Sequence, residues 1–97
     1  MNGHRITLQD DSSKSFIEVE TAGGHSFMLD DQANKIIIKS QGGNEITIDD
    51  TSGKITVTSS GDLALASQGN IDLNANGNLN LTANGRVKVQ GTRIDLN

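Results

Sequence analysis

Paired aspartates are the residues of this sequence that most suggest chemistry. Each pair closes a short alternating stretch, in GHRITLQDD, GHSFMLDD and GNEITIDD. Carboxylate oxygens on a turn are the ligands that Ca²⁺ prefers. The pairs are Asp10-Asp11, Asp30-Asp31 and Asp49-Asp50.

A calcium-binding roll needs more than paired acids. It requires a glycine-rich turn of the form GGxGxD at nonapeptide spacing. The segments Gly23-Gly24-His25 and Gly42-Gly43-Asn44 lack its aspartate. We therefore expect the aspartates to be solvated and to face the amides of their own turns, with calcium binding as the alternative.

The two histidines, His4 and His25, follow a glycine directly in two successive repeats. Equivalent positions of a repeat lie on one edge of a stacked structure, so the two rings could share a metal ion. The third repeat carries Asn44 at this position. We expect a packing or capping role for both histidines, and we assign no metal ligands.

The sequence offers no arrangement for catalysis. It contains no cysteine, neither histidine has a serine and an aspartate arranged as in a triad, and no phosphate-cradling loop precedes a helix. We expect no enzymatic activity, no catalytic residues and no cofactor. A net charge of -4 and an aromatic content of 2% also argue against nucleic-acid binding.

A strict octad repeat occupies the second half of the chain. It reads GKITVTSS, GDLALASQ, GNIDLNAN, GNLNLTAN and then GRVKVQ. Apolar residues alternate within each octad, and that is the period of a β-strand. We expect the glycines to mark corners, because glycine takes positive φ without penalty. The expected corner glycines are Gly53, Gly61, Gly69, Gly77 and Gly85, and the expected core residues are Ile55, Val57, Leu63, Leu65, Ile71, Leu73, Leu79, Leu81, Val87 and Val89.

A longer repeat of about twenty residues fills the first half, and each copy holds an alternating stretch followed by a second predicted strand. The second stretches are Phe16 to Val19, Lys35 to Ile38 and Ile55 to Val57. We interpret this repeat as an octad pair with longer corners. The sequence thus predicts one continuous spike domain: residues 3–54 with longer turns, residues 55–97 with strict octads, and residues 1–2 as a leftover of expression.

An octad supplies one strand and one corner, which is too short to close a coil alone. Three chains could each contribute one side of a triangular layer and share about six aliphatic residues there, at roughly 1.5–3 kcal/mol for each fully buried side chain. The sequence predicts an all-β fold, namely an intertwined homotrimeric triangular β-helix, or triple-stranded β-prism, built from octad repeats.

The tandem octads preceded by GHRITLQDD and GHSFMLDD resemble the C-terminal spike of the VgrG and phage baseplate protein V (gpV-like) family. The resemblance covers the chain from Gly3 onward. It implies a β-helical trimer that acts as the membrane-piercing central spike of a contractile phage tail, a type VI secretion system or an extracellular injection system. No segment matches the oligosaccharide-binding-type barrel of full-length members, so we expect an excised spike domain.

The resemblance also implies partners and a location. The blunt C-terminal end, Arg93, Ile94, Asp95, Leu96 and Asn97, suits docking of a PAAR-like tip protein. An upstream region would join the inner tube and baseplate, and the target membrane would be a transient partner. Such a spike is assembled in the bacterial cytoplasm and belongs to a secreted particle or a virion.

One rival interpretation belongs to another class. A monomeric β-solenoid could serve as a binding module, either an adhesin or a calcium-binding β-roll. Its binding face would be formed by threonines such as Thr7, Thr47, Thr56 and Thr58, although these do not repeat regularly through the octads. In the solenoid a chain seals its aliphatic side chains inside its own coil, and in the trimer it does not.

Overall fold

The computed structural model describes residues 3–96, so the expectation for residues 1–2 and for Asn97 lies outside the described part. All regular structure in this part is β, and no described segment forms a helix that could span a membrane. The strands are β1 (Arg5–Asp10), β2 (Ser15–Glu20), β3 (Ser26–Asp30), β4 (Lys35–Lys39), β5 (Glu45–Asp49) and β6 (Lys54–Thr58).

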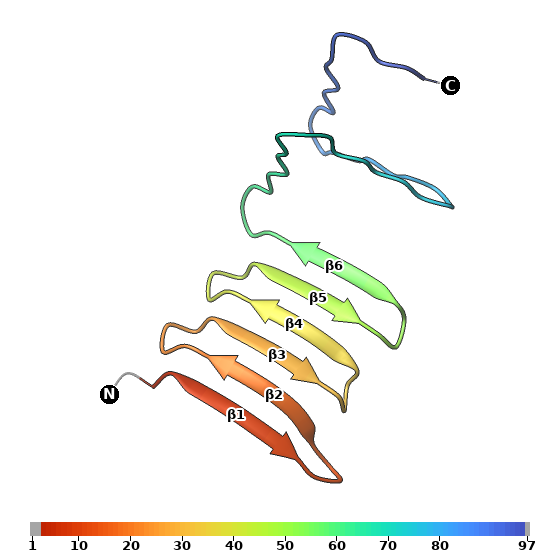
Figure 1. Cartoon of the computed structure of the whole chain (residues 1–97). Helices are drawn as coiled ribbons and strands as arrows, with labels where there is room; N and C mark the ends of the chain where they lie inside the picture. The colour runs from red at the N-terminus through yellow and green to blue at the C-terminus, as the bar shows by residue number, and fades with distance from the viewer. Residues whose placement is uncertain (1–2, 97) are drawn as a thin grey trace. The chain divides into compact units, whose positions relative to one another are not determined.

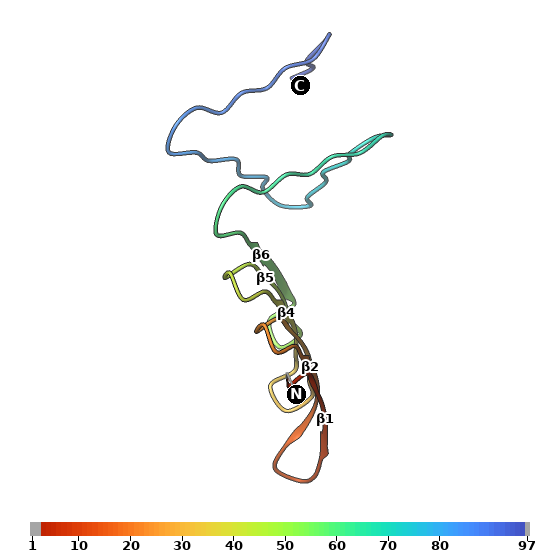
Figure 2. The same ribbon diagram turned by 90° about the vertical axis from the view of Figure 1, so that its left-hand side faces the viewer.

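The chain divides into two units, the first ending at Ala64 and the second beginning at Leu65. The first unit is a six-stranded antiparallel meander in which each strand pairs with its neighbours in sequence (Figure 1). Seen from the side, the strands form a single layer (Figure 2). The all-β class predicted from the sequence is confirmed.

Alternation gives the sheet two chemically different faces, because successive side chains of a strand point to opposite sides. The register aligns two apolar residues from each of the six strands into two rows on one face. One row is Ile6, Val19, Phe27, Ile38, Ile46 and Val57, and the other is Leu8, Ile17, Leu29, Ile36, Ile48 and Ile55. We call these two rows the apolar face.

The opposite face carries most of the charged side chains of the strands, together with the apolar Phe16, Met28 and Ile37. Arg5 is opposite Glu20 and forms an ion pair with it. Further along, Lys35 lies between Asp30 and Asp49, its partners on the two adjacent strands. Opposite charges on facing strands are favourable, whereas like charges there are destabilising. We call this side the polar face.

In residues 5–58 the twenty-residue repeat forms β-hairpin units, whereas the sequence predicts octad pairs with longer corners. The hairpin strands form backbone ladders within the chain. The tight turns explain the difference. In the loops 21–25 and 40–44, Gly24 and Gly43 have φ values of +96° and +95°, and such glycines let short loops reverse the chain.

The second unit consists of extended segments separated by regular bends. The bends lie at Gln68-Gly69, Asn76-Gly77 and Asn84-Gly85, with a further bend at Thr92. The strand of the first octad, Lys54–Thr58, is β6 and belongs to the sheet. The change from hairpin to octad geometry thus falls after Thr58.

Candidate functional site: an uncovered apolar face

Within the first unit of the chain, no segment covers the apolar face. No hydrophobic side chain in residues 3–96 is buried. Exposure ranges along one row from 39% at Val19 and Ile46 to 71% at Ile6, which lies on the edge strand. Six strands thus hold two rows of aliphatic and aromatic side chains in water, an arrangement that the hydrophobic effect opposes.

An open groove of about 420 Å³ lies on this same face, and its apolar lining comes from β2 to β5. Its apolar residues are Val19, Phe27, Ile38 and Ile46, and His25 also lines it. The groove is the central part of one apolar row and does not form a separate site.

The residues predicted to form the octad core are also exposed in the single chain. Their exposed fractions run from 52% at Val57 and Val87 to 74% at Leu65. The complete set is Ile55, Val57, Leu63, Leu65, Ile71, Leu73, Leu79, Leu81, Val87 and Val89. Ile55 and Val57 continue the two rows of the sheet onto β6, so the apolar pattern of the sheet and that of the octads share a strand.

The octad glycines differ from the hairpin glycines. Gly53, in the loop between β5 and β6, has a φ of +76°. Gly61, Gly69, Gly77 and Gly85 lie outside the left-handed region, and no atom would contact a Cβ at Gly61, Gly77 or Gly85. At Gly69 the nearest atom is the Ser67 hydroxyl at 4.0 Å. Neither backbone strain nor crowding within one chain demands glycine at these four positions.

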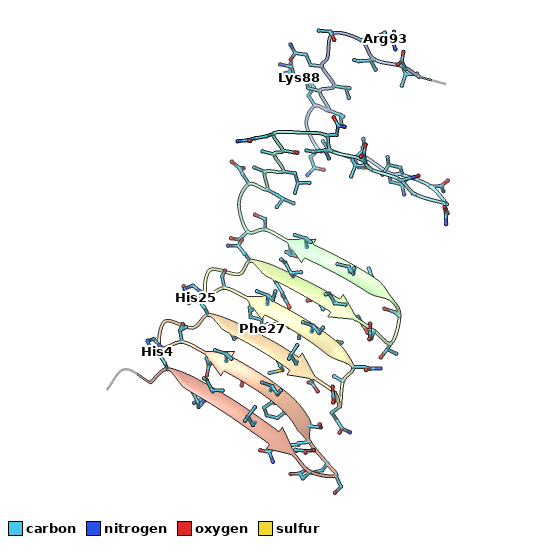
Figure 3. The ribbon with its side chains drawn as sticks, viewed as in Figure 1. His4, His25, Phe27, Lys88 and Arg93 are labelled. Carbon is cyan, nitrogen blue, oxygen red and sulfur yellow. The ribbon has the colours of Figure 1, made fainter. Side chains whose placement is uncertain are left out.

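His4 and His25 lie on one edge of the sheet (Figure 3), and the same kind of hydrogen bond recurs at both. His4 Nδ1 accepts from the Ala22 backbone N–H at 3.0 Å, and His25 Nδ1 accepts from the Gln41 N–H at 3.1 Å. These contacts are those of a capping role, one of the two roles expected for the histidines. Each side chain joins the start of one repeat to the next turn along this edge, and we call this series the capping ladder.

Asn44 extends the capping ladder by one step. Its Oδ1 accepts from the Ser60 backbone N–H at 2.9 Å and from the Ser60 hydroxyl at 3.2 Å. Asn44 occupies the histidine position in the sequence, but the sequence does not show that asparagine and histidine make the same contact there. Both side chains accept a hydrogen bond from a backbone N–H.

The paired aspartates lie at the other edge and bond to their own turns. Asp11 Oδ1 accepts from the Ser13 N–H at 2.9 Å and the Lys14 N–H at 2.8 Å. Asp30 and Asp49 each accept one turn amide in the same way, from Ala33 and Thr51. Hydrogen bonds from the Ser13 and Lys14 backbone lower the pKa of Asp11 from 3.8 to about 2. Within the described residues, no three acidic, histidine or cysteine side chains are grouped as a metal site requires.

The expected tip-docking end is exposed as far as the structure describes it. Arg93 Nε lies 3.2 Å from Asp95 Oδ1, and both side chains are more than three-quarters exposed. Leu96 is 90% exposed and Ile94 49%. Asn97 lies outside the described residues. This end thus offers two apolar side chains and an exposed ion pair.

No protein-family model matches the chain, and no curated protein sequence matches it.

Proposed function

We propose that three copies of this chain assemble through the apolar face and the octads into the central spike of a contractile injection machine. One observation carries the proposal. Two unbroken apolar rows cross all six strands, and no segment of the first unit covers them. Identical copies that turn these rows toward a common axis would remove them from water.

The octads favour three copies over two. Two sheets stacked face to face would cover the apolar face of residues 5–58, but an octad provides only one straight segment and one bend. Three such segments close a triangle, and stacked triangles leave free strand edges only at the two ends. The open space around Gly61, Gly77 and Gly85 fits this arrangement, because backbones of neighbouring chains could approach there.

The machine role rests on the resemblance of the octads and of GHRITLQDD and GHSFMLDD to the VgrG and baseplate protein V spikes. In this proposal the trimer forms a narrow and rigid column that is pushed through a target membrane. Its residues 93–97 would meet a PAAR-like tip, and an upstream region would attach it to the inner tube and baseplate. The particle would be secreted or form part of a virion after assembly in the bacterial cytoplasm.

Light scattering on the purified chain tests the assembly. We expect a particle with three times the chain mass of 10.2 kDa. Leu73→Asp would place three carboxylates in one apolar layer and should abolish the trimer. Asn74→Asp adds the same charge at the next residue, on the other side of the strand, and should leave the mass unchanged. A parent chain that is monomeric or dimeric in solution would refute the proposal.

Co-purification tests the role in the machine. A PAAR-like tip protein expressed with the spike should co-purify with the parent chain. A variant that lacks residues 93–97 should remain trimeric and lose the tip. A trimer that binds the tip equally well without these residues would show that docking occurs elsewhere. The solenoid alternative predicts a monomer whose melting temperature rises strongly with Ca²⁺.

A further inference from the structure

Three turns on the histidine edge of the sheet share one sequence pattern. The loops 21–25 and 40–44 read TAGGH and SQGGN, and they connect β2 to β3 and β4 to β5. The segment 59–63, directly after β6, reads SSGDL. It aligns with the two loops through its first three residues. At the fourth position, Asp62 stands where the loops have Gly24 and Gly43.

The first half of this third turn is held as in the hairpin loops. The Ser60 N–H donates to Asn44 Oδ1 at 2.9 Å. The equivalent Gln41 N–H donates to His25 Nδ1 at 3.1 Å. The loops also stack similarly, because the Gly24 position faces the Gln41 side chain and the Gly43 position faces Ser60. The capping ladder therefore holds the first residues of segment 59–63 in the same way as the first residues of the two hairpin loops.

The second half of the turn departs from the hairpin. In the two loops, the glycine at the fourth position has a φ near +95°. Its N–H donates a hydrogen bond to the carbonyl of the first loop residue. Gly24 donates to Thr21 at 3.0 Å, and Gly43 donates to Ser40 at 3.2 Å. Side chains rarely allow this backbone conformation. Among residues 3–96, Asn34 is the one non-glycine residue with positive φ, so Asp62 does not adopt it.

The third turn closes through a serine hydroxyl instead. Ser59 Oγ accepts from the Gly61 N–H at 3.3 Å and donates to the Asp62 carbonyl at 2.8 Å. The next octad bend closes in the same way, because Ser67 Oγ accepts from the Gly69 N–H at 3.1 Å and donates to the Asn70 carbonyl at 3.2 Å. The third turn thus begins as a hairpin and ends as an octad bend.

We infer that Asp62 is the branch point at which the chain leaves its own sheet. A glycine at this position would let the third turn close as the first two do, and the following octad would pair with β6 of the same chain. Asp62 prevents that closure and leaves the octads free of the sheet. The pairing of the freed octads with neighbouring copies rests on the proposed function. The role of Asp62 as the branch point does not rest on it.

A disulfide reporter tests the branch directly, because the chain contains no cysteine. In the ladder next to loop 40–44, Ile37 pairs with Thr47, and the same spacing would place Thr56 opposite Ala66. Directly opposed strand residues are close enough for a disulfide. In the Thr56→Cys/Ala66→Cys background we expect no intrachain disulfide. Adding Asp62→Gly and Leu63→Asn gives the third turn the closing residues of loop 40–44 and should produce the disulfide, detected by mass spectrometry of peptides.

Two controls separate backbone conformation from other effects. Asp62→Ala removes the carboxylate but still disfavours positive φ, so the reporter should remain reduced. Leu63→Asn alone supplies the cap without the glycine and should also remain reduced. A disulfide that forms with Asp62→Ala as readily as with the glycine variant would overturn the inference, as would its absence from the Asp62→Gly/Leu63→Asn variant.

A reciprocal change covers the case in which that variant fails to fold. Gly43→Asp should make the chain leave the sheet one hairpin early. The Ile37→Cys/Thr47→Cys pair, which bridges β4 and β5, should form its intrachain disulfide in the parent and lose it with Gly43→Asp. Gly42→Asp is the matched control, because Gly42 has no positive φ and open space around it. Retention of the disulfide in Gly43→Asp would count against the branch.

The two proposals fail in different ways. A parent chain that is monomeric in solution refutes the trimeric spike, yet the reporters still show whether Asp62 ends the sheet. A trimeric parent whose Asp62→Gly/Leu63→Asn variant keeps both the trimer and reduced reporters refutes the branch and leaves the spike intact. If both hold, the variant should show the disulfide together with loss of the trimer.

Discussion

His25 ties two successive turns of the sheet together, because its Nδ1 accepts the backbone N–H of Gln41 at 3.1 Å. An imidazole nitrogen accepts a hydrogen bond only where it carries no proton. Asn44 holds Ser60 one repeat later with an amide oxygen. The capping ladder thus requires an acceptor at a fixed place and does not require an imidazole.

Removal of this acceptor should lower the stability of the fold, whereas its replacement by another hydrogen-bond acceptor should not. We expect His25→Ala to lower the free energy of unfolding by about 1 kcal/mol, the usual net contribution of one hydrogen bond. His25→Asn copies the third repeat and should recover most of that loss. Urea unfolding of the three proteins checks this. Equal losses in the alanine and asparagine variants would mean that the ring packs and does not cap.

Asp11 should make the stability of the first turn depend on pH. Its pKa falls from 3.8 to about 2 because turn amides hydrogen-bond the carboxylate. Since the folded pKa lies below the unfolded one, the stabilisation is present above pH 3.8 and is lost as the pH falls toward 2. Unfolding midpoints of the parent and of Asp11→Asn should therefore converge between these pH values. A difference that stays constant across this window would contradict the carboxylate's role.

Gly24 should not tolerate a side chain. Its φ is +96°, and a Cβ there would lie 3.0 Å from Gln41 Cγ. Positive φ costs an L-residue roughly 1–2 kcal/mol, so Gly24→Ala should lower stability by at least about that amount. Gly23→Ala is the adjacent control, because Gly23 lacks positive φ and its nearest atom, Thr21 Oγ1, lies at 3.9 Å. Thermal melts should show a lower midpoint for the first variant and a nearly unchanged one for the second.

Gly77 distinguishes the single chain from the assembly. With open space and no positive φ, Gly77→Ala would on its own stabilise a chain by about 0.4–1 kcal/mol, since alanine restricts the unfolded state. In the proposed trimer the same methyl group crowds three bends in one layer and should lower the melting temperature. Asn78→Ala tests the next residue for comparison. A raised melting temperature for Gly77→Ala would mean that the octad bends are not crowded by other chains.

The sequence predicts the six strands of the sheet well because each needs only local information, whereas the strands predicted in the octads after Thr58 are not formed in the single chain. The predicted strands Phe16 to Val19 and Lys35 to Ile38 lie inside β2 and β4. The aspartate pairs are expected to face their own turns, and Asp11 does so. Alternation and turn chemistry are properties of neighbouring residues, so they can be read without knowledge of the partner strand.

The pairing of the strands is not predicted, although the sequence contains a signal for it. The double glycines at Gly23-Gly24 and Gly42-Gly43 lie in short loops between alternating stretches, which is a hairpin pattern. The regular spacing favours an octad interpretation of the first half instead. The capping ladder cannot be predicted from the sequence, because the register that brings His25 beside Gln41 depends on the pairing.

Val57 offers the sharpest test of the apolar face within the sheet. It ends the row that begins at Ile6, whereas its neighbour Thr56 points to the polar face opposite Thr47. Val57→Asp puts one carboxylate per chain among apolar side chains, and an unpaired charge there is strongly unfavourable. We expect the trimer to dissociate, as seen by light scattering. Thr56→Asp adds the same charge on the same strand and should keep the trimer intact, because its side chain remains in water. If both variants dissociate, charge on β6 is harmful on either face; if neither does, the apolar face is not the surface that holds the copies together.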